Sequence, residues 1–173
     1  MNQDLYNSDW INIDGNNIHK TAIIHPNVRL GTGNTIGAYC VIGGNGEIRG
    51  ANQNEFQGNV VIGNNNVISE FVSIQRPFKK DCSTIIGNNN LIMAHVHIGH
   101  DALIYDDNEI CTSTVIGGYC QIHFRTKIKL MCVLRNRIVV GSDAIIGMGS
   151  VVIKNVDQKA VVYGNPAKEK PIT

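Results

Sequence analysis

The chain is poor in leucine, proline and aromatic residues. Its 173 residues include only 6 Leu, 4 Pro, 1 Trp, 5 Tyr and 4 Phe. Because leucine is a strong helix former, this scarcity argues against a helical bundle. The chain instead has 25 Ile and 16 Val, which suit strands, and 21 Asn and 18 Gly, which tolerate the positive φ of tight corners. The length fits one compact domain.

An excess of one charge, a long apolar run and paired cysteine motifs are also absent. Fifteen basic and 14 acidic residues give a net charge of +1, so nothing global attracts nucleic acid. No stretch approaches the roughly 18 apolar residues of a membrane span, and the N-terminus has no secretion signal. The five cysteines form no CxxC pair, which argues against a disulfide framework or a zinc knuckle. We therefore expect a cytoplasmic protein with no bound metal, no membrane span and no nucleic-acid partner.

Aliphatic residues recur every six positions. Hexads that open with Ile, Leu or Val run through residues 18–48, 62–74 and 86–152, and the residue four positions further on is usually small or modest, as at Cys40 and Ala102. A six-residue period fits neither a helix nor a long two-residue alternation, so each hexad is a short strand followed by a corner. Three hexads then close one coil of eighteen residues. This predicts an all-β fold, a left-handed parallel β-helix built of hexapeptide repeats.

The predicted β-helix spans residues 18–156, between a short N-terminal cap at 1–17 and a C-terminal tail at 157–173. Two segments interrupt the ladder, near residues 49–59 and 76–84, and we expect both to leave the wall as loops. Loops on a rigid scaffold commonly carry function. Two tolerated surface insertions are the alternative interpretation.

Three of the six histidines lie within residues 95–100. His97 closes one hexad and His100 is third in the next, so both are predicted beside one corner, outside the apolar interior. An exposed imidazole titrates near neutral pH and can act as a base. Gly118 follows His100 by eighteen residues, one coil along the same corner, so its backbone N–H can face a developing oxyanion. A surface or subunit contact without chemistry is the alternative for these histidines.

A basic stretch follows this corner. Residues 110–142 contain no acidic side chain but hold five basic ones, Arg125, Lys127, Lys129, Arg135 and Arg137. Such a strip can receive a phosphate-bearing donor or nucleotide. A solvated face is the competing interpretation.

The run NLIMAHVHIGHD, preceded by GNNNVISEFVSIQRP, resembles the UDP-N-acetylglucosamine acyltransferases of lipid A biosynthesis. The resemblance implies that His100 is a general base, which removes a proton from an acceptor hydroxyl or amine as it attacks a thioester. It implies that Asp101 supports His100, that Gly118 supplies the oxyanion N–H, and that His97 lines the acceptor site.

The resemblance extends to the loops and the C-terminus. The segment NQN that ends at Asn54 resembles the family's nucleotide-binding loop, with Asn54 in place of an acidic residue, and we expect Asn54 and Arg76 to bind substrate. The ending YGNPAK resembles that of coenzyme-A-dependent hexapeptide acetyltransferases. Where the acyltransferases have a His-Gln-Phe segment and a further histidine, this chain has Arg-Asn-Arg and Tyr119. The residues expected to bind the donor are Arg135, Asn136, Arg137 and Lys168.

These observations predict an acyltransferase acting on an amine or hydroxyl of a nucleotide-linked sugar. Acetyl-CoA is favoured as the co-substrate over acyl carrier protein, no cofactor is held permanently, and the resemblance implies a homotrimer with sites between adjacent prisms. Three alternatives stay open. They are an acyl-carrier-protein-dependent UDP-N-acetylglucosamine O-acyltransferase, a γ-type carbonic anhydrase-like metal protein, and a non-catalytic β-helix scaffold. For the metal protein, the hexad phases of His95 and His100 do not match that family's arrangement.

Overall fold

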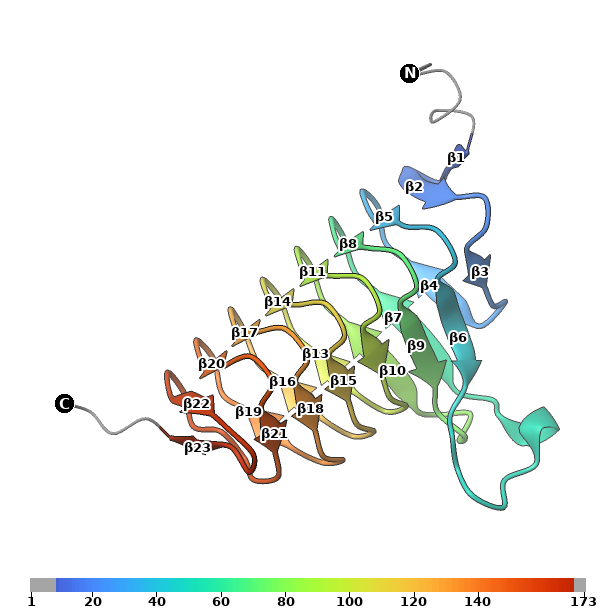
Figure 1. Ribbon diagram of the computed structural model, residues 1–173. Helices are drawn as coiled ribbons and strands as arrows, with labels where there is room; N and C mark the ends of the chain where they lie inside the picture. The colour runs from blue at the N-terminus through green and yellow to red at the C-terminus, as the bar shows by residue number, and fades with distance from the viewer. Residues whose placement is uncertain (1–8, 170–173) are drawn as a thin grey trace.

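The structure, a computed structural model, describes residues 9–169 as one column of stacked coils with the two ends of the chain at opposite ends of the column (Figure 1). Its regular structure consists of short strands in three sheets and a single 3-10 turn, η1 (Gln53–Glu55). Within these residues there is no helix with the length and apolarity needed to cross a membrane.

The three sheets form the walls of the column. Sheet A contains β1 (Trp10–Ile13), β2 (Asn16–His19), β5 (Thr35–Ile36), β8 (Val67–Ile68), β11 (Leu91–Ile92), β14 (Glu109–Ile110), β17 (Lys127–Ile128), β20 (Ile145–Ile146), β22 (Val161–Tyr163) and β23 (Lys168–Glu169). Sheet B contains β3 (Ile23–Ile24), β6 (Val41–Asn45), β9 (Ser73–Arg76), β12 (His97–Ile98), β15 (Val115–Ile116), β18 (Val133–Leu134) and β21 (Val151–Val152). Sheet C contains β4 (Val28–Leu30), β7 (Asn59–Ile62), β10 (Ser83–Ile86), β13 (Leu103–Ile104), β16 (Gln121–Ile122) and β19 (Val139–Val140).

The register of the sheets is that of the hexapeptide repeat. Ile98 pairs with Ile116, Ile116 with Leu134, and Leu134 with Val152, each eighteen residues further along the chain. All pairs within the walls are parallel, and only the β1–β2 and β22–β23 pairs at the two ends are antiparallel. The predicted all-β stack of hexads is therefore confirmed.

The interior of the column is filled by the two inward positions of each hexad. Most residues that open the hexads, such as Ile36 and Ile98, are fully buried. The smaller position includes Cys40, Cys120 and Cys132, which are also fully buried. Burial raises the pKa of the Cys40 thiol to about 11, so at neutral pH this cysteine is an unreactive core residue.

Two kinds of corner residue hold the coils in register. The corner between sheets C and A contains a buried ladder of asparagine side chains, in which the amide oxygen accepts a hydrogen bond from a backbone N–H of the next coil. The ladder consists of Asn16, Asn34, Asn66, Asn90 and Asn108. All three corners also place residues in the left-handed region, and at the corner between sheets B and C these residues include Asp101, Tyr119 and Arg137, with φ of 59°, 60° and 69°. This second corner carries His100.

The C-terminal boundary predicted at residue 156 is wrong. Val156 bridges to Val140, β22 pairs in parallel with β20, and Ala160 and Val162 are buried, so the column continues to Tyr163. Ile146 pairs with Val162, sixteen residues on instead of eighteen. Because this last coil is two residues short, counting in sixes misses it.

A hairpin at the N-terminal end and two loops stand apart from the regular coils. Residues 9–19 form an antiparallel hairpin on the first coil, whereas residues 1–8 of the predicted cap and 170–173 of the tail lie outside the described chain. The loops span 46–58, which contains η1, and 77–82. The first projects from the side of the column (Figure 1).

Candidate active site

The centre of the site is the pair formed by His100 and Asp101 at the corner between β12 and β13. The Nδ1 atom of His100 lies 2.7 Å from Oδ2 of Asp101, and the two side chains are only 12% and 13% exposed. A neutral imidazole that donates its Nδ1–H to the carboxylate keeps an unprotonated Nε2, which is the form a general base requires. The pairing of these two predicted residues therefore suits His100 to the role of a general base.

The backbone of Asp101 is held in place through the side chain of Thr84. Its N–H donates to Oγ1 of Thr84 over 2.9 Å, and the same hydroxyl donates to the carbonyl of Gln75 over 2.7 Å. Thr84 is fully buried. This bridge joins β9, β10 and the corner, so the carboxylate that orients His100 stands on a fixed backbone.

Two glycines enclose the His100 ring. A Cβ built on Gly118 would lie 2.9 Å from Nε2 of His100, so the glycine backbone is in direct contact with the basic nitrogen. Among residues 9–169 the Gly118 N–H donates to no backbone carbonyl, as a donor to an oxyanion requires. A Cβ on Gly46, from the loop 46–58, would lie 3.0 Å from Cβ of His100. Gly46 was not predicted, because nothing in the repeat says where this loop folds.

Tyr119 and Arg137 extend the same corner. The ring of Tyr119 meets the His100 ring edge-on with centroids 5.1 Å apart, and the Arg137 guanidinium lies 4.2 Å above the Tyr119 ring. Two open grooves of about 400 Å³ each meet at Cys82, Asp101 and Tyr119. One runs below the loops, past Phe78 and Lys79, and the other runs past Gln121 and Arg137. A reaction between two substrates needs two such grooves, one for each substrate.

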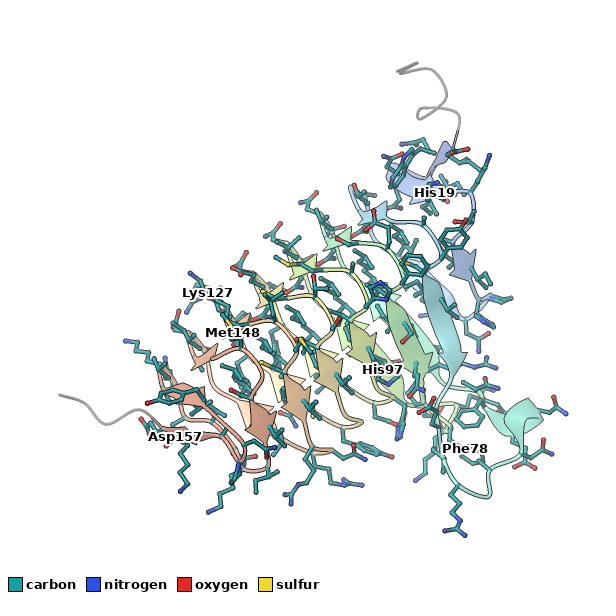
Figure 2. The ribbon with its side chains drawn as sticks, viewed as in Figure 1. His19, Phe78, His97, Lys127, Met148 and Asp157 are labelled. Atoms are coloured by element: carbon teal, nitrogen blue, oxygen red, sulfur yellow. The ribbon has the colours of Figure 1, made fainter. Side chains whose placement is uncertain are left out.

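His97 lies on the outer face of β12 (Figure 2). Its Nδ1 is 2.8 Å from Oγ of Ser73. Burial lowers the pKa of His97, and the negative charge of Glu47 opposes this only in part. A neutral His97 at pH 7 offers a hydrogen-bonding side chain without a charge, which suits contact with a sugar hydroxyl.

The two residues predicted to bind substrate from the loops have different surroundings. Arg76, at the end of β9, donates from Nε to Oδ1 of Asn45 over 2.8 Å, so it braces the base of the first loop. Asn54 is exposed in η1. The loops hold each other through an edge-on contact between Phe56 and Phe78, with centroids 5.3 Å apart. No contact within residues 9–169 brings Asn54 to His100, and its role stays a prediction.

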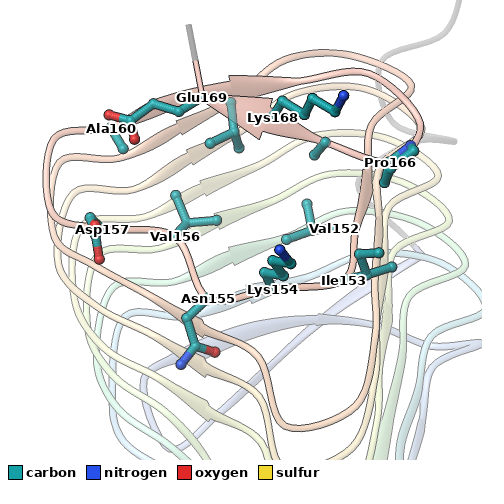
Figure 3. Close-up of a pocket in the computed structure, with 12 residues that line it drawn as sticks. Val152, Ile153, Lys154, Asn155, Val156, Asp157, Ala160, Pro166, Lys168 and Glu169 are labelled. Atoms are coloured by element: carbon teal, nitrogen blue, oxygen red, sulfur yellow. The ribbon is translucent and has the colours of Figure 1, made fainter.

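The four residues predicted to bind the donor do not lie together. Arg137 contacts Tyr119, and the Asn136 side chain covers Gly117. Arg135 is exposed in the same corner segment. Lys168 belongs to β23 and lines a separate cavity of about 300 Å³ at the C-terminal end of the column, together with Lys154 (Figure 3). The repeat could not locate Lys168, because it lies beyond the last regular coil.

The basic strip predicted over residues 125–137 is not one surface. Arg125 pairs with Asp143 on the corner between sheets C and A, and Lys129 pairs with Glu109 beside sheet A. Lys127 is in sheet A, whereas His97 is in sheet B (Figure 2). Successive residues of a β-helix point to different walls, so a run of charge in sequence is divided among faces. Only the part at positions 135 and 137 stays near the site.

The histidines of this corner do not form a metal centre with neighbouring side chains. Among residues 9–169, no group of three or more His, Cys, Asp or Glu side chains is arranged to hold a metal ion.

Comparisons with known proteins find similar acyltransferases. An acyl-[acyl-carrier-protein]–UDP-N-acetylglucosamine O-acyltransferase from Pseudomonas paraeruginosa is 32% identical over 112 residues, which are 64% of this chain and 43% of that protein. The chain is related to these acyltransferases. No protein-family model matches it. The chain spans less than half the length of the curated relatives that it matches.

Solved acyltransferase structures share the whole column. The UDP-N-acetylglucosamine acyltransferase from Bacteroides fragilis superimposes with a TM-score of 0.86 at 32% identity, over 92% of this chain and 62% of that one. The Arabidopsis UDP-N-acetylglucosamine acyltransferase superimposes with a TM-score of 0.81 at 30% identity, over the same shares. The left-handed β-helix predicted from the repeat is therefore confirmed.

Proposed function

We propose that the protein is an acyltransferase that moves an acyl group from a thioester to a hydroxyl or amine of a nucleotide-linked sugar. The observation that carries the proposal is the His100–Asp101 pair, whose Nε2 lies against Gly118, in a corner where two grooves meet. The named activity of the acyltransferases to which the chain is similar supports it.

The proposed reaction uses three groups of the chain. Nε2 of His100 takes the proton from the acceptor as its oxygen or nitrogen attacks the thioester carbonyl. The N–H of Gly118 donates to the oxyanion that forms on the carbonyl oxygen. When the carbon–sulfur bond breaks, the thiolate leaves and receives the proton from Nε2. Asp101 stabilises the imidazolium that exists between these two steps, since it accepts the Nδ1–H throughout.

The grooves separate the two substrates. The groove below the loops contains Arg49 and Lys79 beside apolar Ile48 and Phe78, and the other contains Arg137 and Gln121. Arg and Lys side chains bind phosphates, which both a sugar nucleotide and a pantetheine-linked donor carry. We assign Arg137 to the donor, as predicted, together with Arg135 and Asn136, and His97 to the acceptor.

Two donors remain to be compared. The name of the Pseudomonas relative specifies acyl groups on acyl carrier protein, whereas the C-terminal motif favours acetyl-CoA. Both are thioesters of the same pantetheine thiol, so the chemistry at His100 is common to them. UDP-N-acetylglucosamine is the first acceptor to test, because the relatives' names contain it.

We also propose that the protein is a homotrimer with its sites between adjacent prisms. Exposed apolar side chains on the walls and corners, among them Val115, Val133 and Met131, support an association of this kind. Native mass spectrometry at micromolar concentration tests the proposal: a single species of three chains agrees with it, and a monomer at all concentrations contradicts it.

The activity test combines both donors with a panel of nucleotide-linked sugars. Products are separated by chromatography and identified by mass, since a thiol reagent would also react with the partly exposed Cys82. His100→Ala is expected to lower kcat by about 10² or more, the contribution typical of a general base. His123→Ala is the matched control, because His123 also packs against a tyrosine but on another corner. Near-normal turnover of His100→Ala would contradict the assignment.

A further inference from the structure

One line of corner residues contains groups of complementary chemistry. Asp101, Tyr119 and Arg137 follow one another at intervals of eighteen residues, all in the left-handed region. Their backbones are fixed by the stack, because the Tyr119 N–H donates to the His100 carbonyl and the Arg137 N–H donates to the Gly118 carbonyl, both over 2.9 Å. A carboxylate, a phenol and a guanidinium are thus stacked in that order beside His100.

Tyr119 contacts both members of the His100–Asp101 pair. Its ring stands at 85° to the His100 ring, with the centroids 5.1 Å apart, so it limits rotation of the imidazole. Burial raises the pKa of the Tyr119 hydroxyl and the charge of Asp101 raises it further, while the charge of Arg137 opposes this only in part. The hydroxyl is therefore protonated at neutral pH and can donate to the carboxylate. Asp101 then has two neighbouring groups that can donate to it, the Nδ1–H of His100 at 2.7 Å and the Tyr119 hydroxyl.

Arg137 holds Tyr119 from the outer side. Its Cζ lies 4.2 Å from the centre of the Tyr119 ring, within the range of a cation–π contact. Within residues 9–169, Arg137 forms no ion pair, unlike Arg125 and Lys129. The Arg137 guanidinium thus packs on the Tyr119 ring and does not pair with a carboxylate of the described residues. It also borders one of the two grooves.

We infer that Tyr119 is a positioning residue for the His100–Asp101 pair and that Arg137 keeps Tyr119 in place. The inference rests on the proposed function for its consequence in catalysis. Tyr119 keeps the Asp101 carboxylate turned toward Nδ1, which holds His100 in the Nδ1–H tautomer and leaves Nε2 free to accept a proton. Because Tyr119 borders both grooves, it does so at the point where the two grooves meet.

The first test reads the tautomer of His100 and needs no substrate. Long-range proton–nitrogen NMR correlations of the ¹⁵N-labelled full chain distinguish Nδ1–H from Nε2–H for each of the six histidines, and the His100→Ala spectrum identifies the His100 signals. Wild type is expected to show His100 as Nδ1–H. Tyr119→Phe, which removes only the hydroxyl, is expected to add the Nε2–H form. Tyr105→Phe is the control, because Tyr105 packs against His123 with centroids 5.0 Å apart on another corner.

The second test uses turnover with the donor and acceptor found in the activity panel. Tyr119→Phe is expected to lower kcat roughly tenfold with little change in KM, since the lost hydrogen bond orients the base and does not hold substrate. Arg137→Gln is expected to lower kcat by about two- to fivefold, the range for loss of an exposed cation–π contact. If Arg137 also binds the donor, the donor KM rises as well.

The outcomes separate the inference from the proposed function. A single Nδ1–H tautomer in both Tyr119→Phe and Arg137→Gln, with kcat within twofold of wild type, would overturn the inference. An Nε2–H signal in Tyr119→Phe without acyl transfer by the wild type supports the positioning role and contradicts the proposed function. Thermal unfolding of each variant checks that it is folded, and unchanged signals from the other five histidines show that the change is local.

Discussion

The basic nitrogen of His100 faces the backbone of Gly118 so closely that a methyl group at position 118 would lie 2.9 Å from Nε2. This contact joins two residues eighteen positions apart, and it leaves room for a substrate proton but not for a side chain. Since Gly118 does not have a positive φ, its lack of a side chain is a requirement of space and not of backbone conformation.

Gly118→Ala is therefore expected to keep the fold with some loss of stability, since its methyl group would also lie 3.1 Å from the His100 carbonyl oxygen, and to lose activity. The methyl group presses on Nε2 and displaces either the imidazole or the oxyanion, so kcat should fall by about 10²-fold or more. Steady-state kinetics with the substrates of the activity panel measure this. Gly44→Ala is the control, because its methyl group would meet only a Val41 side chain at 3.4 Å. Equal activity of the two variants would show that Nε2 is not the reacting atom.

Thr84→Val is expected to affect both stability and activity. Valine keeps the volume of threonine but removes the hydroxyl that joins Asp101 N–H to the Gln75 carbonyl. Leaving these buried groups unpaired costs about 1–3 kcal/mol, and the looser Asp101 should lower kcat. Denaturant unfolding and kinetics measure the two effects. Thr114→Val, which removes a buried hydroxyl bonded to the Lys129 carbonyl, should lose stability with no change in kcat.

The neutral His97 predicts a pH dependence of stability. Its pKa in the folded protein is below the usual 6.5 because of burial, so the unfolded chain binds the proton more readily at this position. The free energy of unfolding should therefore decrease as the pH falls from 7 through 6.5 and below. His97→Gln should make this decrease smaller. Denaturant titrations of both proteins between pH 5 and 8 test the prediction, and parallel curves would contradict it.

Asn90→Ala is expected to destabilise the column without touching the site. Its side-chain oxygen accepts the Asn108 N–H over 2.9 Å, and its amide donates to the Asn66 oxygen over 3.0 Å. Loss of both bonds inside a buried ladder should cost about 2–3 kcal/mol. Thermal or denaturant unfolding measures this. The exposed Asn17→Ala, in β2, should change the free energy of unfolding by less than about 0.5 kcal/mol.

The repeat predicts that His100 and Gly118 lie next to each other. In a regular coil, the position of a residue within its hexad determines its wall or corner, and each eighteen residues add one coil. Counting along the sequence in this way places His100 and Gly118 on one corner, and the contact between Gly118 and Nε2 agrees with it. The same counting places Asp101, Tyr119 and Arg137 in one line, although it does not say which way their side chains turn.

The sequence by itself determined the fold and the register of the coils, and it placed the candidate site residues His100 and Gly118 on one corner, because one inward β-branched residue per hexad is compatible with little other than a β-helix. Only the tertiary structure decided how Gly46 covers His100, how Tyr119 and Arg137 stack on the pair, and that Lys168 lies at the far end of the column. The physical reason is that a period assigns positions to the backbone of regular coils. Residues in loops and in the short last coil have no such period, and side-chain contacts depend on rotamers that no period specifies.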